Sequence, residues 1–268
     1  MAQLVLTQRQ KREADFYRQY ASIQRVRCVD WAPVQGREQR LWNPYWHVYH
    51  LARRSLTRPG QRLLDFGCGV GIAAVRLAYL GYQVDGFDLS EENLAAAQQL
   101  AQEHRLADRC QFNRMAAERL DYPGDHFDVV VGIDILHHVE IGPAVREARR
   151  VLKPGGVAIF KEHIEAPLIE PLRRSWLFQR LAPLEPSLEH HITPDERKLT
   201  RDDLRLITSQ FRRVRTRWFT LLERLDRILP GGQSESRRGR LQRLDHRLLH
   251  LCPPMRKLAG TVVLICYK

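Results

Sequence analysis

A glycine turn between two apolar runs is the feature that most constrains this chain. The sequence LLDFGCGVG at residues 63–71 joins a strand-like run to a helix-like run, with glycines at positions 67, 69 and 71. Such a turn directs backbone N–H groups and the positive end of a helix dipole toward a ligand. The third glycine comes one residue too early for the GxGxxG pattern that binds dinucleotides. The turn therefore predicts a nucleotide-like ligand other than a dinucleotide.

Two carboxylates, one on each side of the turn, indicate the chemistry of that ligand. Asp65 lies two residues before the first glycine, where a fixed negative charge would repel a pyrophosphate and attract an ammonium group. Asp88 ends the next strand-like run, where an acid can accept two hydrogen bonds from a ribose diol. A ligand with an amino-acid end and a ribose is S-adenosylmethionine (SAM).

The surrounding sequence alternates strand-like and helix-like runs, which predicts an α/β fold with a parallel sheet. KPGG at residues 153–156 is predicted to be a turn between a helix and the next strand. The expected strands are 63–66, 83–87, 111–115, 129–134 and 157–161, and the expected helices are 72–80, 91–103 and 143–151.

Four motifs in this region resemble those of class I SAM-dependent methyltransferases. LLDFGCGVG is similar to their first motif, acid-x-Gly-x-Gly-x-Gly, and VDGFDLS is similar to their second, acidic motif. FDVVVGIDILHHV and REARRVLKPGGVAIF resemble later motifs of the small-molecule branch that includes quinone-biosynthesis methyltransferases. The resemblance covers residues 60–160. It implies a Rossmann-like, doubly wound, seven-stranded sheet with an antiparallel last strand.

The resemblance also implies a cofactor site for SAM, with S-adenosylhomocysteine as the product. The glycine turn would follow the methionine part of SAM, Asp88 would hold the ribose, and Leu89 would pack on the adenine. In the sequence MAAERL, Ala116 replaces the Asp that often reads the adenine amino group, so Glu118 or the backbone would supply that contact. The expected cofactor residues are Asp65, Gly67, Cys68, Gly69, Asp88, Leu89, Ala117, Glu118 and Asp134.

Candidate bases for the transfer step lie after the fourth and fifth expected strands. They are His137, His138, Glu162 and His163. A histidine titrates near pH 6.5, which suits proton removal from a phenol or an enol. Packing is the alternative explanation for these side chains. We expect no metal, because adjacent histidines point in diverging directions and neither they nor the EHH at 189–191 have HxxxH spacing.

We interpret residues 1–268 as one methyltransferase domain with three parts. These are an N-terminal helical cap at 1–59, a SAM-binding core at 60–162, and a substrate-side region at 163–268 with a helical insertion at 221–259. The aromatic segment LWNPYWHVYH would either cover the cofactor and substrate or pack on the core. In the insertion, two leucine stripes predict two amphipathic helices. Their residues are Leu221, Leu222, Leu225, Ile228 and Leu229, then Leu241, Leu244 and Leu248.

The positive charge of the chain is compatible with several kinds of partner. The formal net charge is +12, and residues 201–257 hold 15 Arg or Lys against 6 Asp or Glu. The insertion is expected to be a lid over the substrate pocket, with contact to an anionic membrane or a second subunit as alternatives. Five cysteines without paired spacing favour a cytoplasmic protein, and peripheral membrane association stays open.

The predicted function is methyl transfer from SAM to an O or C atom of a small organic or lipid-like substrate. An RNA methyltransferase that uses the basic C-terminal region, and a SAM-binding protein without catalysis, are the alternatives.

Overall fold

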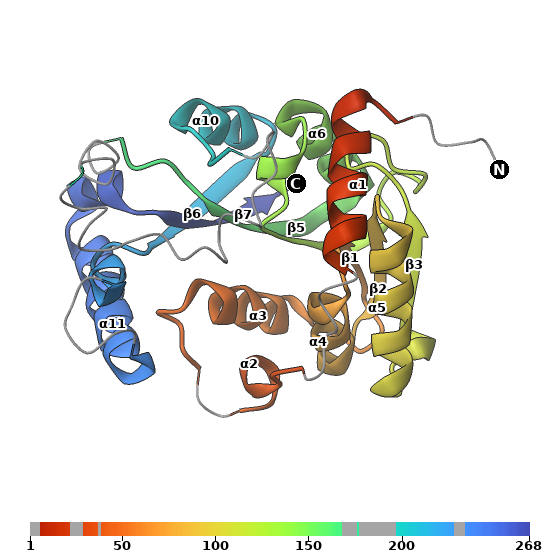
Figure 1. Cartoon of the computed structure of the whole chain (residues 1–268), viewed down its shortest axis with the longest axis horizontal. Coiled ribbons are helices and arrows are strands. Elements are labelled where there is room, and N and C mark those ends of the chain that lie inside the picture. The colour runs from red at the N-terminus through yellow and green to blue at the C-terminus, as the bar shows by residue number, and fades with distance from the viewer. Residues whose placement is uncertain (1–5, 22–28, 37–38, 168–175, 177–196, 228–233) are drawn as a thin grey trace.

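A seven-stranded mixed sheet organises the molecule (Figure 1). The computed structural model describes residues 6–21, 29–36, 39–167, 176, 197–227 and 234–268. The strand order is β3-β2-β1-β4-β5-β7-β6, and β7 is antiparallel to both of its neighbours. This confirms the predicted doubly wound sheet with an antiparallel last strand. The strands are β1 Arg62–Phe66, β2 Gln83–Asp88, β3 Cys110–Arg114, β4 Phe127–Ile133, β5 Leu152–His163, β6 Arg213–Phe219 and β7 Thr261–Tyr267.

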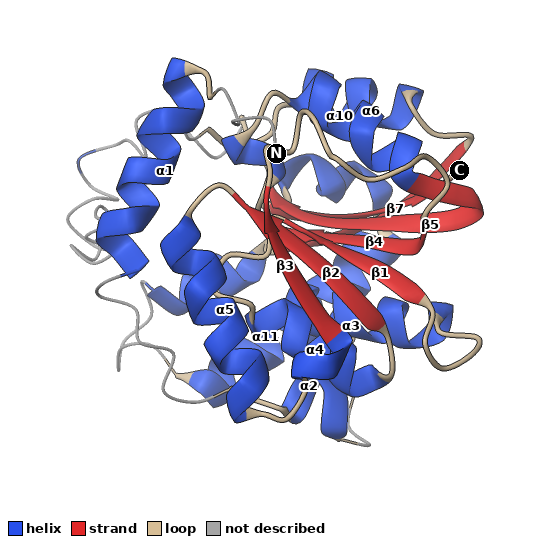
Figure 2. Cartoon of the chain, turned by 90° about the vertical axis from the view of Figure 1, so that its right-hand side faces the viewer, coloured by secondary structure: helices blue, strands red, loops and turns tan. Residues whose placement is uncertain are grey.

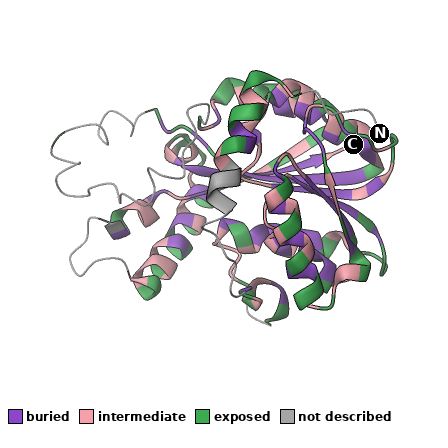
Figure 3. Cartoon of the chain, turned by 45° about the vertical axis from the view of Figure 1, so that its right-hand side comes forward, coloured by how far each residue is buried: buried purple, intermediate pink, exposed green. Residues whose placement is uncertain are grey.

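Helices cover both faces of the sheet (Figure 2). One face packs on α3, α4 and α5, and the other packs on α6 and α10. Both interfaces are apolar, and Figure 3 shows the buried residues concentrated in the strands and on the inner sides of the helices. The α-helices are α1 Gln8–Ala21, α2 Ala32–Gln35, α3 Pro44–Ser55, α4 Ile72–Leu80, α5 Glu91–Glu103, α6 Ile141–Val151, α10 Arg201–Ser209 and α11 Glu235–Leu251. The 3₁₀ turns are η1 Ala107–Arg109, η2 Leu136–His138, η3 Leu222–Arg227 and η4 Pro253–Leu258.

Side-chain caps fix the start of two helices, α5 and α10. The Ser90 side chain accepts a hydrogen bond from the Asn93 N–H and starts α5. Thr200 and Asp203 form a reciprocal capping box at the start of α10. The helices α4 and α5 have the predicted bounds, while α6 begins at Ile141, two residues earlier than expected.

The KPGG motif is not a separate turn, which corrects the prediction. Residues 153–156 lie within β5, where the pairing with β4 shifts register between Phe127 and Val129. Gly155 has a φ of 77°, a left-handed conformation that glycine adopts without a steric penalty. The strand therefore passes through the motif as an irregularity rather than beginning after it.

The aromatic segment of α3 serves both predicted roles, packing on the core and covering the site. The Asn43 side chain accepts hydrogen bonds from the N–H groups of Tyr45 and Trp46 and so caps the helix. Tyr49 is buried against the sheet and Tyr45 is 42% exposed, and both line the cavity described below. The helix therefore packs on the core and also contributes to the site.

The insertion between β6 and β7 differs from its predicted form. The first leucine stripe forms the 3₁₀ turn η3 rather than an amphipathic α-helix, and residues 228 and 229 of that stripe lie outside the described residues. The second stripe, Leu241, Leu244 and Leu248, is not the buried face of α11. The buried residues of that helix are instead Gln242, Asp245 and Leu249.

A buried carboxylate explains this change of face. Asp245 is 2% exposed and accepts hydrogen bonds from the N–H groups of Leu221, Leu222 and Glu223, at 2.6–3.1 Å. It satisfies the N–H groups at the start of η3, which have no partner within that turn. A small apolar cluster of Leu221, Leu249 and Ala259 completes the contact.

The EHH motif at 189–191 lies outside the described residues. Among the helices that are described, none has the length and apolar character needed to cross a bilayer.

Candidate cofactor-binding and catalytic site

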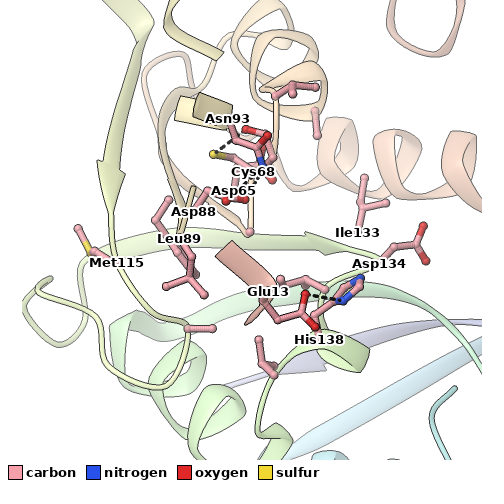
Figure 4. A pocket seen from close by; sticks show the side chains of 18 of the residues that line it. Glu13, Asp65, Cys68, Asp88, Leu89, Asn93, Met115, Ile133, Asp134 and His138 are labelled. Atoms are coloured by element: carbon pink, nitrogen blue, oxygen red, sulfur yellow. Dashed lines mark hydrogen bonds and ion pairs between the residues drawn. The ribbon is translucent and has the colours of Figure 1, made fainter. Parts of the chain in front are cut away.

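A cavity of about 680 Å³ opens where β1, β2 and β4 end (Figure 4). Parallel strands bring their carboxyl ends to one edge of the sheet, and α/β proteins bind ligands at that edge. The helices α1 and α3 add further walls. All nine predicted cofactor residues line this cavity: Asp65, Gly67, Cys68, Gly69, Asp88, Leu89, Ala117, Glu118 and Asp134.

The glycine turn has the conformation that its sequence predicts. Gly67 and Gly69 have φ values of 78° and 51°, in the left-handed region that glycine tolerates best. A Cβ at Gly67 would lie 2.5 Å from the Ile135 side chain. A Cβ at Gly69 would meet no atom within 4 Å. The turn therefore passes close to the protein at Gly67 and leaves open space at Gly69.

Asp65 is a buried acid with unused hydrogen-bonding capacity. It is 1% exposed, and its Oδ2 atom has no hydrogen-bond partner among the described residues. Burial raises the pKa of Asp65 to about 7, because the ionised form loses its hydration. A cationic ligand group in the cavity would stabilise the ionised carboxylate.

Asp88 connects the glycine turn to α5. Its Oδ2 accepts a hydrogen bond from the Gly69 N–H at 3.1 Å, and its Oδ1 accepts one from the Ser90 N–H at 2.9 Å. The Asn93 side chain donates a third hydrogen bond at 3.3 Å. Burial raises the pKa of Asp88, against the opposing effect of these hydrogen bonds. The carboxylate is thus held in a fixed orientation at the cavity wall.

Glu118 links three parts of the wall. It accepts a hydrogen bond from the Glu140 N–H at 3.0 Å and another from the Gln10 side chain on α1 at 2.8 Å. Leu89, Met115 and Ala117 supply apolar surface in the same part of the cavity.

A second polar cluster, which the sequence analysis did not predict as a unit, adjoins the cavity at Asp134. Lys161 is fully buried in β5, and its Nζ donates to both carboxylate oxygens of Asp134 at 2.7 Å. The Tyr45 hydroxyl donates to Asp134 at 2.9 Å and accepts from Lys161 at 3.2 Å. A lysine within the apolar strand sequence VAIFKEH is the signal that could have revealed this cluster.

The charges in this cluster stabilise one another. Burial opposes ionisation of Asp134, but the Lys161 charge outweighs it and holds the pKa of Asp134 below its usual value. Burial likewise disfavours the charged form of Lys161, yet Asp134 keeps the pKa of Lys161 above its usual value. Asp134 also has a φ of 55°, which is uncommon for a residue other than glycine. The sheet edge is thus fixed by a buried ion pair.

His137 and Glu162 form a buried pair. The His137 Nδ1 lies 2.6 Å from Glu162 Oε2, and the side chains are 7% and 0% exposed. The other oxygen, Oε1, accepts hydrogen bonds from the N–H groups of Ile135 and Leu136. Glu162 therefore orients both the histidine and the turn that carries it.

The other two histidine candidates have different surroundings. His138 lines the cavity, with its Nδ1 3.4 Å from the Glu13 carboxylate of α1 (Figure 4). His163 lies outside the cavity lining, and its Nε2 lies 3.2 Å from the Lys161 ammonium. Burial and the Lys161 charge lower the pKa of His163 to about 4. Of the four candidates, His138 alone lines the cavity; His137 and Glu162 form a buried pair outside the lining, and His163 is engaged with Lys161.

Asp134, His137 and Glu162 place ligand-type atoms within 4.8 Å of one another. Their interactions differ from those of a metal site. Lys161 already neutralises Asp134, and Glu162 is engaged by His137 and two backbone N–H groups. These atoms are therefore used in ion pairs and hydrogen bonds.

Comparison with protein families assigns the core of the chain. Residues 64–160 match the family model described as "Methyltransferase domain". The chain is 41% identical over 101 residues to the 27-O-demethylrifamycin SV methyltransferase of Amycolatopsis mediterranei, covering 37% of each chain. It is 33% identical over 118 residues to a ubiquinone biosynthesis O-methyltransferase of Bradyrhizobium diazoefficiens, covering 44% of this chain and 42% of that protein. Residues 64–160 are therefore similar to the methyltransferase domain, and the matches span about two fifths of these relatives.

Solved structures extend the similarity in fold beyond this segment. The geranyl diphosphate C-methyltransferase of Streptomyces coelicolor A3(2), solved with Mg²⁺, geranyl diphosphate and S-adenosylhomocysteine, aligns with a TM-score of 0.54. The alignment covers 98% of this chain and 99% of that protein at 16% identity. The cyclase SpnF aligns with a TM-score of 0.54 at 23% identity, covering 83% and 80% of the two chains. These likenesses support the class I methyltransferase fold.

Proposed function

We propose that this protein is a SAM-dependent methyltransferase that acts on an O or C atom of a small organic or lipid-like molecule. The observation that carries the proposal is the Asp65 carboxylate, which is buried beside the glycine turn with one oxygen lacking a hydrogen-bond partner among the described residues. An ammonium group satisfies that oxygen, while a second negative charge would be repelled. The relatives support the proposal, because those named above are methyltransferases.

The residues of the cavity fit the parts of SAM. SAM supplies a methyl group activated by its sulfonium centre. Asp65 pairs with the ammonium group, and Asp88 accepts hydrogen bonds from the ribose hydroxyls. Leu89, Met115 and Ala117 bury the adenine ring. Glu118 replaces the missing acid at Ala116 as the group that accepts from the adenine amine.

His137 is the general base in this proposal, acting from just outside the cavity lining, where its ring adjoins that of His138. A neutral histidine that donates its Nδ1–H to Glu162 carries its lone pair on Nε2, where it can accept a proton from an acceptor hydroxyl. Glu162 then stabilises the imidazolium, since an opposite charge at 2.6 Å favours the protonated ring. His163 fits this task less well, because burial and the Lys161 ammonium at its Nε2 lower its pKa to about 4.

His138 has a separate task in the same site. It lines the cavity beside Glu13 of α1, so that the pair joins the N-terminal helix to the substrate side of the cavity. We assign it to substrate positioning, while Asp134, held by Lys161 and Tyr45, fixes the wall beside the methionine part of SAM.

The cyclase SpnF raises a second possibility, a different reaction on the same fold. Fold alone does not decide between the two reactions. The discriminating experiment is transfer of a labelled methyl group from SAM to a metabolite extract separated into lipid, small-molecule and RNA pools. We expect label in the lipid or small-molecule pool.

Variants of His137 and Glu162 test whether His137 is the general base. For an acceptor that must lose a proton, His137→Gln should lower kcat by about 10²–10⁴-fold, and Glu162→Gln should lower it less. SAM affinity should be unchanged in both variants. His163→Gln is the matched control and should retain activity. Label in the RNA pool alone would contradict the proposed small-molecule or lipid-like substrate. Full activity of His137→Gln would contradict the role of His137 as the general base.

A further inference from the structure

Three histidines and an arginine gather where α3, β6 and α11 meet, away from the cavity described above. The rings of His47 on α3 and His246 on α11 both approach Phe219, with centroids 5.5 Å and 6.4 Å away. His50 lies one helical turn from His47, with the two rings 6.2 Å apart. Arg217 precedes Phe219 by two residues on β6 and therefore points to the same face of the sheet. None of these residues lines the cofactor cavity.

His47 is the innermost member of this cluster and has unused polar atoms. It is 7% exposed, and neither ring nitrogen has a hydrogen bond of normal geometry among the described residues. Burial, together with the charges of His50, Arg217 and His246, lowers the pKa of His47 to about 4. Among the described residues, the Leu41 backbone alone favours the charged ring. Apart from this weak backbone contact, the buried ring lacks an acceptor.

The outer members have the same kind of environment. Burial, Arg217 and His250 lower the pKa of His246. Burial and the two arginines at the end of α3, Arg54 and Arg53, lower the pKa of His50. The arginines that act on these histidines, Arg217, Arg53 and Arg54, all disfavour protonation of the rings, so the cluster combines neutral ring N–H donors with an excess of positive charge.

The nearby acids of the insertion are engaged elsewhere. Asp245 precedes His246 in α11, but its carboxylate accepts from the three N–H groups at the start of η3. Asp226 pairs with Arg237 at 2.5 Å and with Arg238 at 3.5 Å. Glu223 accepts a hydrogen bond from the Gln242 side chain. Within the described part of the chain, no carboxylate pairs with Arg217.

We propose that this cluster is a binding site for a tetrahedral oxyanion, a phosphate group either free or in a lipid headgroup. Its centre is His47, Arg217 and His246. A phosphate group supplies the acceptors that the ring N–H groups lack and the negative charge that the arginine lacks. The surroundings also suit a headgroup, because the exposed leucines Leu244 and Leu251 lie on the same helix as His246.

Sulfate is the first probe, because it remains doubly charged between pH 5 and pH 8. Bound sulfate stabilises the protonated histidines, so binding takes up protons and affinity should rise as the pH falls from 8 to 6. Titration calorimetry measures the affinity, and histidine NMR signals identify the rings that change. We expect the signals of His47 and His246 to move together with saturating sulfate.

Arg217→Gln and His246→Gln test the assignment to these residues. Loss of a charge-assisted hydrogen bond should weaken sulfate binding about tenfold or more in Arg217→Gln. Arg205→Gln is the charge-matched control, since Arg205 is exposed on α10 and pairs with Asp202. Equal affinities for wild type, Arg217→Gln and Arg205→Gln, or sulfate binding that does not depend on pH, would overturn the proposal. SAM affinity of the same variants should equal that of wild type, so this test is independent of methyl transfer.

Two further arms distinguish the sources of the phosphate group. Inorganic phosphate is titrated in solution, and vesicles of phosphatidylglycerol are compared with vesicles of phosphatidylcholine in sedimentation. Saturable binding of inorganic phosphate that Arg217→Gln weakens supports a free ligand. Sedimentation with phosphatidylglycerol vesicles alone, again weakened by Arg217→Gln, supports a headgroup. Sedimentation that Arg205→Gln weakens equally indicates general charge attraction and contradicts the site.

Discussion

The core at residues 60–162 and the insertion at 221–259 use buried polar groups in opposite ways. In the core, the Asp65 carboxylate is buried with spare hydrogen-bonding capacity and faces a cavity. In the insertion, the Asp245 carboxylate is buried with three backbone donors and faces a turn. A buried acid therefore indicates a ligand in one region and a structural cap in the other. The number of protein donors that reach the carboxylate distinguishes the two cases.

The largest expected effect belongs to the glycine turn of the core. In Gly67→Val the new side chain would overlap Ile135 and require a left-handed backbone that valine disfavours. We expect SAM affinity to fall by at least about 100-fold, since a shift of the turn misplaces every contact along it. Calorimetry on the folded variant measures this loss.

A glycine in the insertion provides the matched control for Gly67→Val. Gly239 lies in α11, and a Cβ at this position would meet no atom within 4 Å. Gly239→Ala should therefore preserve SAM affinity and stabilise the helix, because alanine has the higher helix propensity. Unchanged SAM affinity in Gly67→Val would contradict the position of the cofactor at the turn.

The second prediction concerns the cap in the insertion. Asp245→Ala removes the acceptor of three N–H groups, and hydrogen bonds to a charged group contribute about 1.5–3 kcal/mol each. We expect local destabilisation of η3 and α11 of roughly 3 kcal/mol with SAM affinity unchanged. Hydrogen exchange of the two elements measures the effect. Asp202→Ala on α10 is the control, because Asp202 is exposed, and equal protection in both variants would refute the cap.

The sequence predicts the core far better than the insertion, and the reason is physical. The bounds of α4 and α5 follow from local signals, namely glycines at both ends of one helix and the Ser90 cap of the other. The face of α11 does not, because Asp245 is buried through its contact with a turn that is more than twenty residues away in the chain. A leucine stripe alone therefore selects the wrong face.

The site likewise contains residues that the local sequence predicts and residues that only the tertiary structure brings together. The cofactor residues follow from the motif spacing, and the structure gathers them around one cavity. The Tyr45–Asp134–Lys161 cluster joins three elements that no local pattern connects. Lys161 in an apolar strand indicates only that a partner exists, and tertiary structure identifies that partner.

A third prediction sharpens the assignment of Asp88. Asp88→Ala should weaken SAM binding about 10- to 100-fold, because the ribose loses a charged acceptor and the Gly69 N–H loses its anchor. Asp88→Asn retains one acceptor oxygen and should lose less. Calorimetry of both variants provides the measurement, and equal affinity of Asp88→Ala and wild type would exclude the ribose contact.

The smallest predicted effect is on the stability of the ligand-free protein. Burial raises the pKa of folded Asp65 to about 7, above its value of 3.8 when unfolded. The folded protein therefore binds more protons between these values, and the contribution of Asp65 to stability falls as the pH rises from about 4 to about 7. Asp65→Asn should raise the unfolding free energy by about 1–2 kcal/mol at pH 8 and change little at pH 4. Denaturant unfolding at both pH values tests this, and a destabilised variant at pH 8 would contradict it.

The most direct test of the cofactor site is calorimetry of S-adenosylhomocysteine binding to the wild-type protein at pH 6 and pH 8. The ammonium group of this ligand requires ionised Asp65, whose pKa is raised to about 7 by burial. We therefore predict one ligand bound per chain, higher affinity at pH 8 than at pH 6, and release of protons on binding at pH 6. Absence of binding, or affinity that rises as the pH falls, would contradict the proposed role of the Asp65 carboxylate.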